Sequence, residues 1–409
     1  MNFARRWRKW LPGLLWLGFT LGVEAQVDPV PRDLIQLGYD QPLEGRSPLG
    51  AYAFYYHNQP DFLRTNITLR LAVAPVYLDS ELGFTGLLGP NTDVGLGLAG
   101  GGYADGFSEI RHGKYYPGES FDGHGLEVSA SLYHLFNPGD LIPLNFVLRG
   151  STHYSIYVAD DTAPGFAVPS NRTTFNIRSG LRWGGIEPTL YPALAMELSV
   201  WYEGEFRSDS SPYGFFRDGS FDRKVESQSH LFWTRESLTY TLPDSQQSFS
   251  ATLQAGTSVQ ADRFSAYRIG GSLPLVAEFP LSLPGYYYQE ISARQFVLFN
   301  ANYLLPLDSA KRWNLNLDAA TAVVDYLPGL GQPGNSLSGV GGGILYRAKS
   351  DRWKMIVDYG YGINAIRAGG RGASSVDVLL QIDLGKIHGS PFHPLQPGLW
   401  RGWRGLFGS

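Results

Sequence analysis

The sequence predicts an all-β protein: a transmembrane antiparallel β-barrel of about 16 strands, with 14 strands as the alternative. Three observations lead to this prediction, namely long segments in which apolar and polar residues alternate, aromatic residues near the segment ends, and connections that alternate between short and long. In residues 313–327 (WNLNLDAATAVVDYL), Leu315 and Leu317 lie on one face of the predicted strand. Asn314 and Asn316 lie on the other face, which we expect to line a wet lumen.

The composition fits a protein that shows much of its surface to lipid. Charged residues make up 17% of the 409-residue chain and aromatic residues 14%, whereas soluble proteins carry roughly 25% charged residues. Lys and Arg total 33 against 37 for Asp and Glu. This balance lacks the basic excess of nucleic-acid-binding proteins, so no nucleic-acid partner is predicted. There are no cysteines, which excludes a disulfide framework.

Residues 1–25 are predicted to be a cleavable signal peptide. Cationic residues precede the apolar run LPGLLWLGFTLG, and the small residue Ala25 ends the segment. An uncleaved membrane anchor is the alternative, although the run is shorter than the roughly 20 residues that a spanning helix needs. An exported chain with alternating strands is expected in the bacterial outer membrane.

The barrel is predicted over residues 26–386, with no separate domain before it. Residues 26–88 supply either four strands or two longer ones, and residues 93–386 supply twelve. The four strands are expected near residues 33–40, 49–57, 66–77 and 80–88. Residues 387–409 form a C-terminal tail whose Trp and Arg residues suit a membrane interface.

A soluble β-sandwich could also use alternating strands, with the apolar faces turned inward. Segments of 10 to 14 residues and the regular alternation of connection lengths favour the membrane barrel. Short connections are predicted at 89–92, 137–143, 187–192, 243–247, 307–312 and 348–352. Long connections are predicted at 107–122, 159–171, 207–226, 263–291, 328–336 and 367–374.

The predicted lumen carries charges of both signs on neighbouring strands, where they can form pairs across strands. One interpretation is a transverse field that selects solutes. The other is a mesh of ion pairs that fills a narrow or plugged barrel. The residues concerned are Arg149, Arg178, Arg182, Glu197, Glu203 and Glu205.

The longest loop, residues 262–293, is mostly apolar, which would be costly in bulk water. We therefore expect it to fold against the barrel mouth or into the lumen. The stretches RIGG, LPGYYYQEISARQFVLFNANYLLPL and NLDAAT resemble the sixth outer loop and flanking strands of the BamA/TamA surface-antigen superfamily. Five predicted strands follow the loop, as in that superfamily. The resemblance implies ancestry with these barrels, here without their periplasmic repeat domains.

The resemblance also implies a lock between this loop and the lumen. Pro284 occupies the place of the superfamily's loop arginine, so the usual ion pair with Asp318 cannot form. Arg268 is the predicted substitute. The hypothetical lock comprises Arg268, Gly270, Gly271, Gly285, Tyr286 and Asp318.

The sequence predicts no catalytic, cofactor or metal site, and the protein is not expected to be an enzyme. A lipid hydrolase using His230 with Ser229 or Ser237 is a minor alternative. Three acidic residues of one predicted outer loop could bind divalent cations, although a solvated loop is the simpler interpretation. They are Asp209, Asp218 and Asp222.

The resemblance implies a role in inserting or translocating proteins into or across the outer membrane. The alternative is a porin-like diffusion channel for small polar solutes. The expected partners are outer-membrane lipid and either protein clients or small polar solutes.

Overall fold

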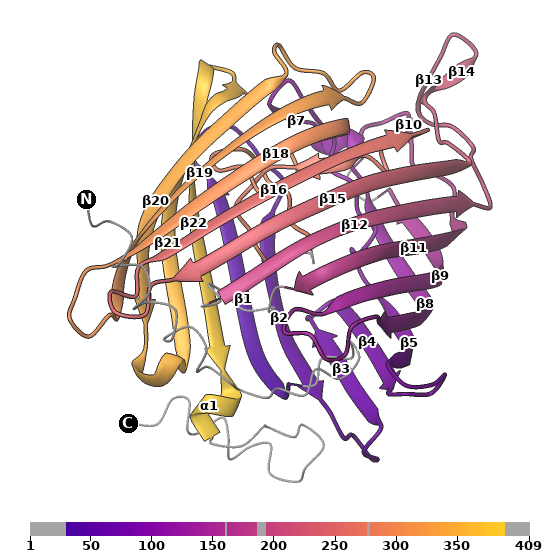
Figure 1. Cartoon of the computed structure of the whole chain (residues 1–409). Helices are drawn as coiled ribbons and strands as arrows, with labels where there is room; N and C mark the ends of the chain where they lie inside the picture. Colours follow the sequence, from indigo (N-terminus) through magenta and orange to yellow (C-terminus); the bar gives the residue numbers. More distant parts are fainter. Residues whose placement is uncertain (1–29, 160–161, 186–193, 276–278, 389–409) are drawn as a thin grey trace, which may run out of the picture.

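The computed structural model describes residues 30–159, 162–185, 194–275 and 279–388. Within these ranges sixteen long strands form an all-β barrel in which each strand pairs antiparallel with its neighbours (Figure 1). The first and last strands pair with each other from Leu34↔Asp383 to Pro42↔Ser375, which closes the cylinder. The strands are β1 (Arg32–Pro42), β2 (Gly50–Gln59), β3 (Ile67–Val73), β4 (Tyr77–Phe84), β5 (Thr92–Gly101), β8 (Asp122–Leu135), β9 (Leu144–Val158), β11 (Arg172–Gly185), β12 (Leu194–Arg207), β15 (Gln228–Thr241), β16 (Ser248–Val259), β18 (Ile291–Pro306), β19 (Trp313–Tyr326), β20 (Ser336–Arg347), β21 (Trp353–Arg367) and β22 (Gly370–Asp383).

The two ends of the barrel differ. The turn end, where β1 begins and β22 ends, carries short connections such as 242–247 and 307–312. The loop end carries the long connections 102–121, 208–227 and 260–290, which contain most of the short elements. The short elements are β6 (Ile110–Arg111), β7 (Lys114–Tyr115), η2 (Pro117–Glu119), β10 (Phe166–Ala167), β13 (Tyr213–Arg217), β14 (Ser220–Arg223), β17 (Tyr267–Ile269), η3 (Lys349–Asp351) and α1 (Leu384–His388).

The predicted closed barrel of sixteen strands is confirmed, including four strands before residue 88 and five after the longest loop. The predicted alternation of connection lengths is wrong at one of the predicted long connections, 367–374, because only residues 368–369 separate β21 from β22. The connection between β3 and β4, residues 74–76, is short as well, as the predicted strands near 66–77 and 80–88 imply. The predicted loop at 367–374 is short because both strands extend beyond the barrel wall, past an irregularity in the pairing between Gly362 and Ile366. The predicted signal peptide and nearly all of the tail lie outside the described residues.

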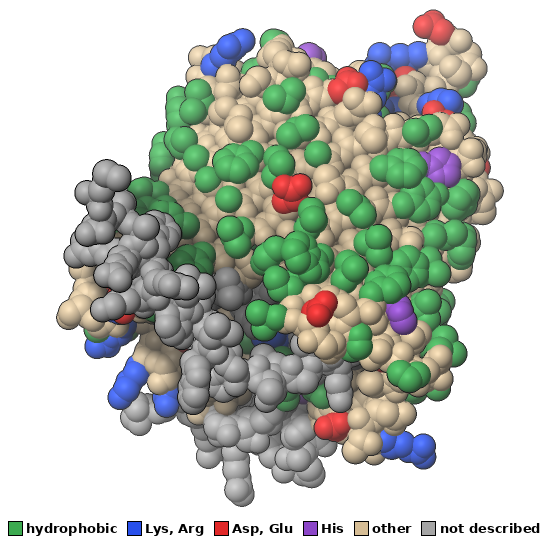
Figure 2. Space-filling view, in the orientation of Figure 1, with side chains coloured by type: hydrophobic (Ala, Val, Ile, Leu, Met, Phe, Trp, Pro, Cys, Tyr) green, Lys and Arg blue, Asp and Glu red, His purple; other side chains and the backbone are tan. Residues whose placement is uncertain are grey.

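The outward face of the wall is apolar and the inward face is buried. On β19, Leu317 is 45% exposed while Asn316 is 2% exposed. Figure 2 shows one face of this wall, on which hydrophobic and uncharged side chains predominate between the two ends. Near the turn end the ring of Tyr346 lies 4.8 Å from that of Trp313 and 4.9 Å from that of Trp353. Such aromatic belts are typical of barrels at a membrane–water interface.

The helices in the described part of the chain are too short or too polar to cross a bilayer.

The lumen is not polar throughout, and the longest loop occupies part of it, which is one of the two placements expected from the sequence. On β19 the inward-facing residues Asn314 and Asn316 are followed toward the loop end by Ala320, Ala322 and Val324, all buried. The reason is that residues of the longest loop fill this part of the barrel with apolar side chains of their own.

Candidate functional site

The candidate site is the connection between β16 and β18, residues 260–290, which we call the lumen loop. It first extends the sheet, because β17 pairs with β18 from Tyr267↔Ala293 to Ile269↔Ile291. At Gly270 and Gly271 the backbone adopts φ angles of 137° and 74°. A Cβ on Gly270 would lie 2.4 Å from the Tyr287 carbonyl oxygen, so only glycine fits this turn.

Two apolar clusters hold the lumen loop inside the barrel. Near the loop end, Ile269, Leu283 and Tyr286 are fully buried against β18, β19 and β20. Nearer the turn end, Leu273 packs against inward-facing residues of four strands, Leu304, Leu345, Ile356 and Leu379. Full burial of one such side chain contributes about 1.5–3 kcal/mol. The loop is therefore docked as a folded part of the structure.

Glycines of the inner wall form a seat for the loop at Pro284 and Gly285. A Cβ on Gly339 of β20 would lie 2.3 Å from the Pro284 carbonyl oxygen, and one on Gly360 of β21 would lie 2.8 Å from the Gly285 nitrogen. Conversely, a Cβ on Gly285 would lie 1.9 Å from the nitrogen of Gly362. The loop backbone thus lies directly on the strand backbone. The run SGVGGG at 338–343 is the sequence signal for this seat, which the alternation of apolar and polar residues does not reveal.

Arg367, at the end of β21, clamps the last part of the lumen loop. Its guanidinium donates from Nη1 to Oε1 of Glu290 at 3.1 Å and from Nη2 to Oε2 at 3.0 Å. Both side chains are almost fully buried, at 4% and 0% exposure. The guanidinium also lies 3.6 Å from the ring centre of Tyr287, and Nη2 donates to the Gly285 carbonyl at 3.4 Å. We call this group, Arg367 with Glu290, Tyr287 and Gly285, the lumen clamp.

The structure does not bring Arg268 and Asp318 together, so the predicted ion pair of the lock is absent. Arg268 donates instead to the carbonyls of Ser108 at 2.9 Å and Gln289 at 3.1 Å. Burial lowers the pKa of Arg268 to about 10, which leaves it a cation at neutral pH. Asp318 lies on the inner wall beside Gly341, where a Cβ would be 2.6 Å from its carboxylate oxygens. In the lumen clamp the barrel supplies the arginine and the loop supplies the carboxylate.

The predicted lumen charges line the inner wall of β9, β11 and β12, away from the lumen clamp. Arg178 forms an ion pair with Glu203 at 3.1 Å, and Arg182 one with Glu197 at 3.0 Å. The remaining two predicted residues pair with charges outside the predicted set: Arg149 with Glu127 at 2.9 Å, and Glu205 with Arg207. Several of these side chains are only partly buried, so this side of the lumen is polar while the opposite side is filled by the loop.

A cavity of about 400 Å³ lies between the lumen loop and this polar wall. Phe279 of the loop borders it and packs against Trp233, with ring centres 4.4 Å apart. The Arg178 guanidinium lies 4.9 Å from the Phe279 ring, within reach of a cation–π contact. Phe279 therefore anchors the loop to the polar wall, opposite the lumen clamp.

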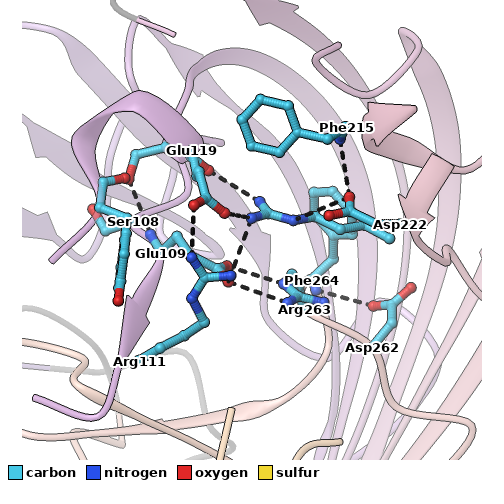
Figure 3. A network of polar contacts seen from close by, with 12 residues as sticks. Ser108, Glu109, Arg111, Glu119, Phe215, Asp222, Asp262, Arg263 and Phe264 are labelled. Atoms are coloured by element: carbon cyan, nitrogen blue, oxygen red, sulfur yellow. Dashed lines mark hydrogen bonds and ion pairs between the residues drawn. The ribbon is translucent and has the colours of Figure 1, made fainter. Parts of the chain in front are cut away.

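At the loop end, a network of charges joins three connections (Figure 3). Glu109, fully buried in the connection 102–121, accepts from Arg263 of the lumen loop at 3.0 and 3.1 Å. The guanidinium of Arg223, from the connection 208–227, lies 3.5 Å from the same carboxylate. Burial alone would lower the pKa of Arg263, but the ion pair with Glu109 holds it above its ordinary value. The first part of the lumen loop is thus joined by ion pairs to the connections 102–121 and 208–227.

The remaining sequence candidates are separated in space. His230 faces outward and contacts the Tyr202 hydroxyl at 2.9 Å, whereas Ser229 and Ser237 lie on the inward face of the same strand. Asp209 accepts from the Ser211 hydroxyl at 2.7 Å, and Asp222 accepts from the Phe215 amide at 2.9 Å. Throughout the described ranges, no group of three His, Cys, Asp or Glu side chains is placed to hold a metal ion.

Comparison with solved structures identifies the fold. CdiB from Acinetobacter baumannii matches with a TM-score of 0.54 at 10% identity, over 86% of this chain and 60% of that one. CdiB from Escherichia coli matches with a TM-score of 0.55 at 11% identity, over 85% and 63%. BamA from Haemophilus ducreyi, in a form lacking POTRA domains 1–3, matches with a TM-score of 0.52 at 11% identity, over 86% and 70%. The chain has the fold of the CdiB and BamA barrels.

The resemblance to the BamA/TamA superfamily is therefore confirmed at the level of fold. The chain spans less than two thirds of the length of either CdiB chain. No protein-family model matches the sequence. No curated protein matches it either.

Proposed function

We propose that the protein is an outer-membrane barrel that inserts or translocates proteins, with the lumen loop as the element that controls the lumen. The observation that carries this proposal is the lumen loop itself, whose described residues are largely apolar and are docked and clamped inside a closed barrel of sixteen strands. The similarity in fold to the CdiB and BamA barrels supports a general role of this kind. The turn end then faces the periplasm and the loop end faces the outside.

The geometry suggests how such a barrel handles a polypeptide. Charged pairs on β11 and β12 offer a polar surface along which an extended chain can move. Such side chains can form hydrogen bonds with the peptide groups of that chain, which would otherwise lose their bonds to water. The lumen loop occupies the other half and excludes free passage of solutes. The loop must shift before a chain can cross, and the lumen clamp sets the free energy of that shift.

The second candidate is a diffusion channel for small polar solutes. It is favoured by one observation, the partly exposed rows of opposite charges on the polar wall, which resemble the selective linings of channels. Under this alternative the lumen loop only narrows the pore. Conduction would then need no displacement of the loop.

Conductance in planar bilayers distinguishes the two candidates. We expect the full barrel to conduct little, and a variant that lacks residues 268–288 to conduct strongly, because the loop occupies the lumen. A large steady conductance in the full barrel that survives the deletion would instead favour the channel.

The activity itself is tested with proteoliposomes and an unfolded outer-membrane β-barrel protein as client. We expect the client to fold into the bilayer faster with the barrel present than in empty liposomes. An equal rate would contradict the proposal.

A further inference from the structure

The outward face of β15 carries a carboxyl group within the hydrophobic wall. Glu236 is exposed, and the alternating pattern of β15 turns its neighbours Arg235 and Ser237 toward the lumen. Directly opposite Glu236 on the adjacent strands stand Leu198 of β12 and Leu253 of β16. A carboxyl group is thus surrounded by side chains suited to lipid.

The position along the strand places this group deep in the wall. Tyr240, on the same face of β15 and nearer the turn end, pairs with Phe249 of β16 as part of the aromatic belt. Glu236 precedes Tyr240 by four residues. At about 3.3 Å per residue and a strand tilt of about 40°, it lies about 10 Å further from the turn end than the belt. Since the apolar band of such barrels is about 25 Å tall, Glu236 lies within the hydrocarbon region.

Another exposed acidic group near the end of the wall has a partner. Asp325 forms an ion pair with Arg294 at 2.7 Å near the loop end, and both side chains are about half exposed. For Glu236 the structure shows neither a hydrogen bond nor an ion pair to any other described residue. Unpaired charges in the hydrocarbon region are costly, and such residues commonly mark functional sites.

The surface around Glu236 leaves the carboxylate open to approach. Its diagonal neighbours include Thr234 on its own strand and Ala251 and Ala255 on β16, all small. Small residues let the backbone or side chain of a second membrane-embedded segment come close. The patch is therefore accessible from the bilayer and complementary to a cation.

We propose that Glu236 is the docking point for a second membrane-embedded polypeptide that carries a Lys or Arg at the same depth. A lipid amine is excluded as the partner by depth, since headgroups lie outside the hydrocarbon region. A two-fold contact with a second copy through this patch would bring Glu236 toward its own equivalent, and the patch residues supply no cation. This inference is independent of the proposed function.

The test uses a defined probe. A synthetic transmembrane helix of Leu and Ala with one central Lys is reconstituted in liposomes with the barrel, and a matched helix has Leu in place of the Lys. The chain has no cysteine, so an introduced Asp244→Cys in the turn after β15 carries a single dye for energy transfer to the labelled helix. Heat-modifiable gel migration checks that each variant is folded.

We expect the Lys helix to associate with the wild-type barrel at least tenfold more strongly than the Leu helix. Glu236→Gln should abolish the difference, and Glu236→Asp should keep most of it. If the two helices associate equally with the wild-type barrel, the proposal is wrong, whatever the Glu236 variants show. Equal binding of the Lys helix to the wild-type barrel and to Glu236→Gln would overturn it as well.

Discussion

Replacing Arg367 by alanine should loosen the lumen loop at one defined place. The change leaves the Glu290 carboxylate fully buried without its cation, and removes the contact with the Tyr287 ring. Breaking a buried ion pair by removing one partner costs about 3–5 kcal/mol. If this cost falls on the docked state of residues 285–290, the population of the locally open state rises by between about a hundredfold and a few thousandfold, at about 1.4 kcal/mol per factor of ten.

Amide hydrogen exchange measures this opening directly. In the docked loop the Tyr287 amide donates to Glu290 Oε2 at 2.9 Å, and the Glu290 amide donates to the Tyr287 carbonyl at 3.0 Å. Both amides should exchange at least a hundredfold faster in Arg367→Ala. Arg371→Ala, at an exposed position of β22, is the matched control and should leave these rates unchanged.

A second variant separates the charge effect from lost packing. The double variant Arg367→Met with Glu290→Gln removes both charges and keeps most of the volume, so it should recover most of the protection. If Arg367→Ala exchanges in this segment no faster than Arg371→Ala, the clamp does not hold the loop and the reasoning fails.

Two further predictions concern the loop seat and a contact at the loop end. Gly285→Ala should lower the thermal stability far more than Gly329→Ala. Both glycines have positive φ, but only the Cβ added at residue 285 meets strand backbone, at 1.9 Å from the Gly362 nitrogen. Equal shifts in the temperature of heat-modifiable gel migration for the two variants would contradict this. Burial alone would raise the pKa of Asp105, yet hydrogen bonds, first from His153, hold it below its ordinary value. The contact therefore stabilises above about pH 4 and is lost under stronger acid; a spin label nearby should show this acid transition, and Asp105→Asn should lack it.

The strands could be predicted from sequence because the two faces of each strand lie in different environments, one outside the barrel and one in the lumen. Period-two alternation reports which side chains share a face, and this predicted about sixteen strands, with fourteen as the alternative, and the inward residues of several of them. It does not report what the inward face touches. Asn316 and Ala322 lie on the same inward face of β19, yet one meets polar side chains and the other meets the lumen loop. That distinction depends on where a distant loop packs.

The lumen clamp could not be found from spacing. Arg367 and Glu290 are 77 residues apart, and they meet only because β21 extends past the barrel wall at the place where the loop turns back. Arg268 is the predicted substitute for the superfamily's loop arginine, but its side chain donates to the Ser108 carbonyl of the connection 102–121. The apolar composition of the loop predicts that the loop is buried. Which residues anchor it depends on how the folded strands align with the loop.

The seat formed by Gly339, Gly360 and Gly362 has a consequence for how the lumen loop finds its place. Bare peptide groups line this furrow, so recognition there depends on the course of the main chain and hardly on side-chain identity. A displaced loop can therefore return to this one position only, because its backbone must fit the furrow between the strand backbones. Substitutions at loop positions outside the two apolar clusters and the lumen clamp would therefore leave that position unchanged, provided residue 285 remains glycine.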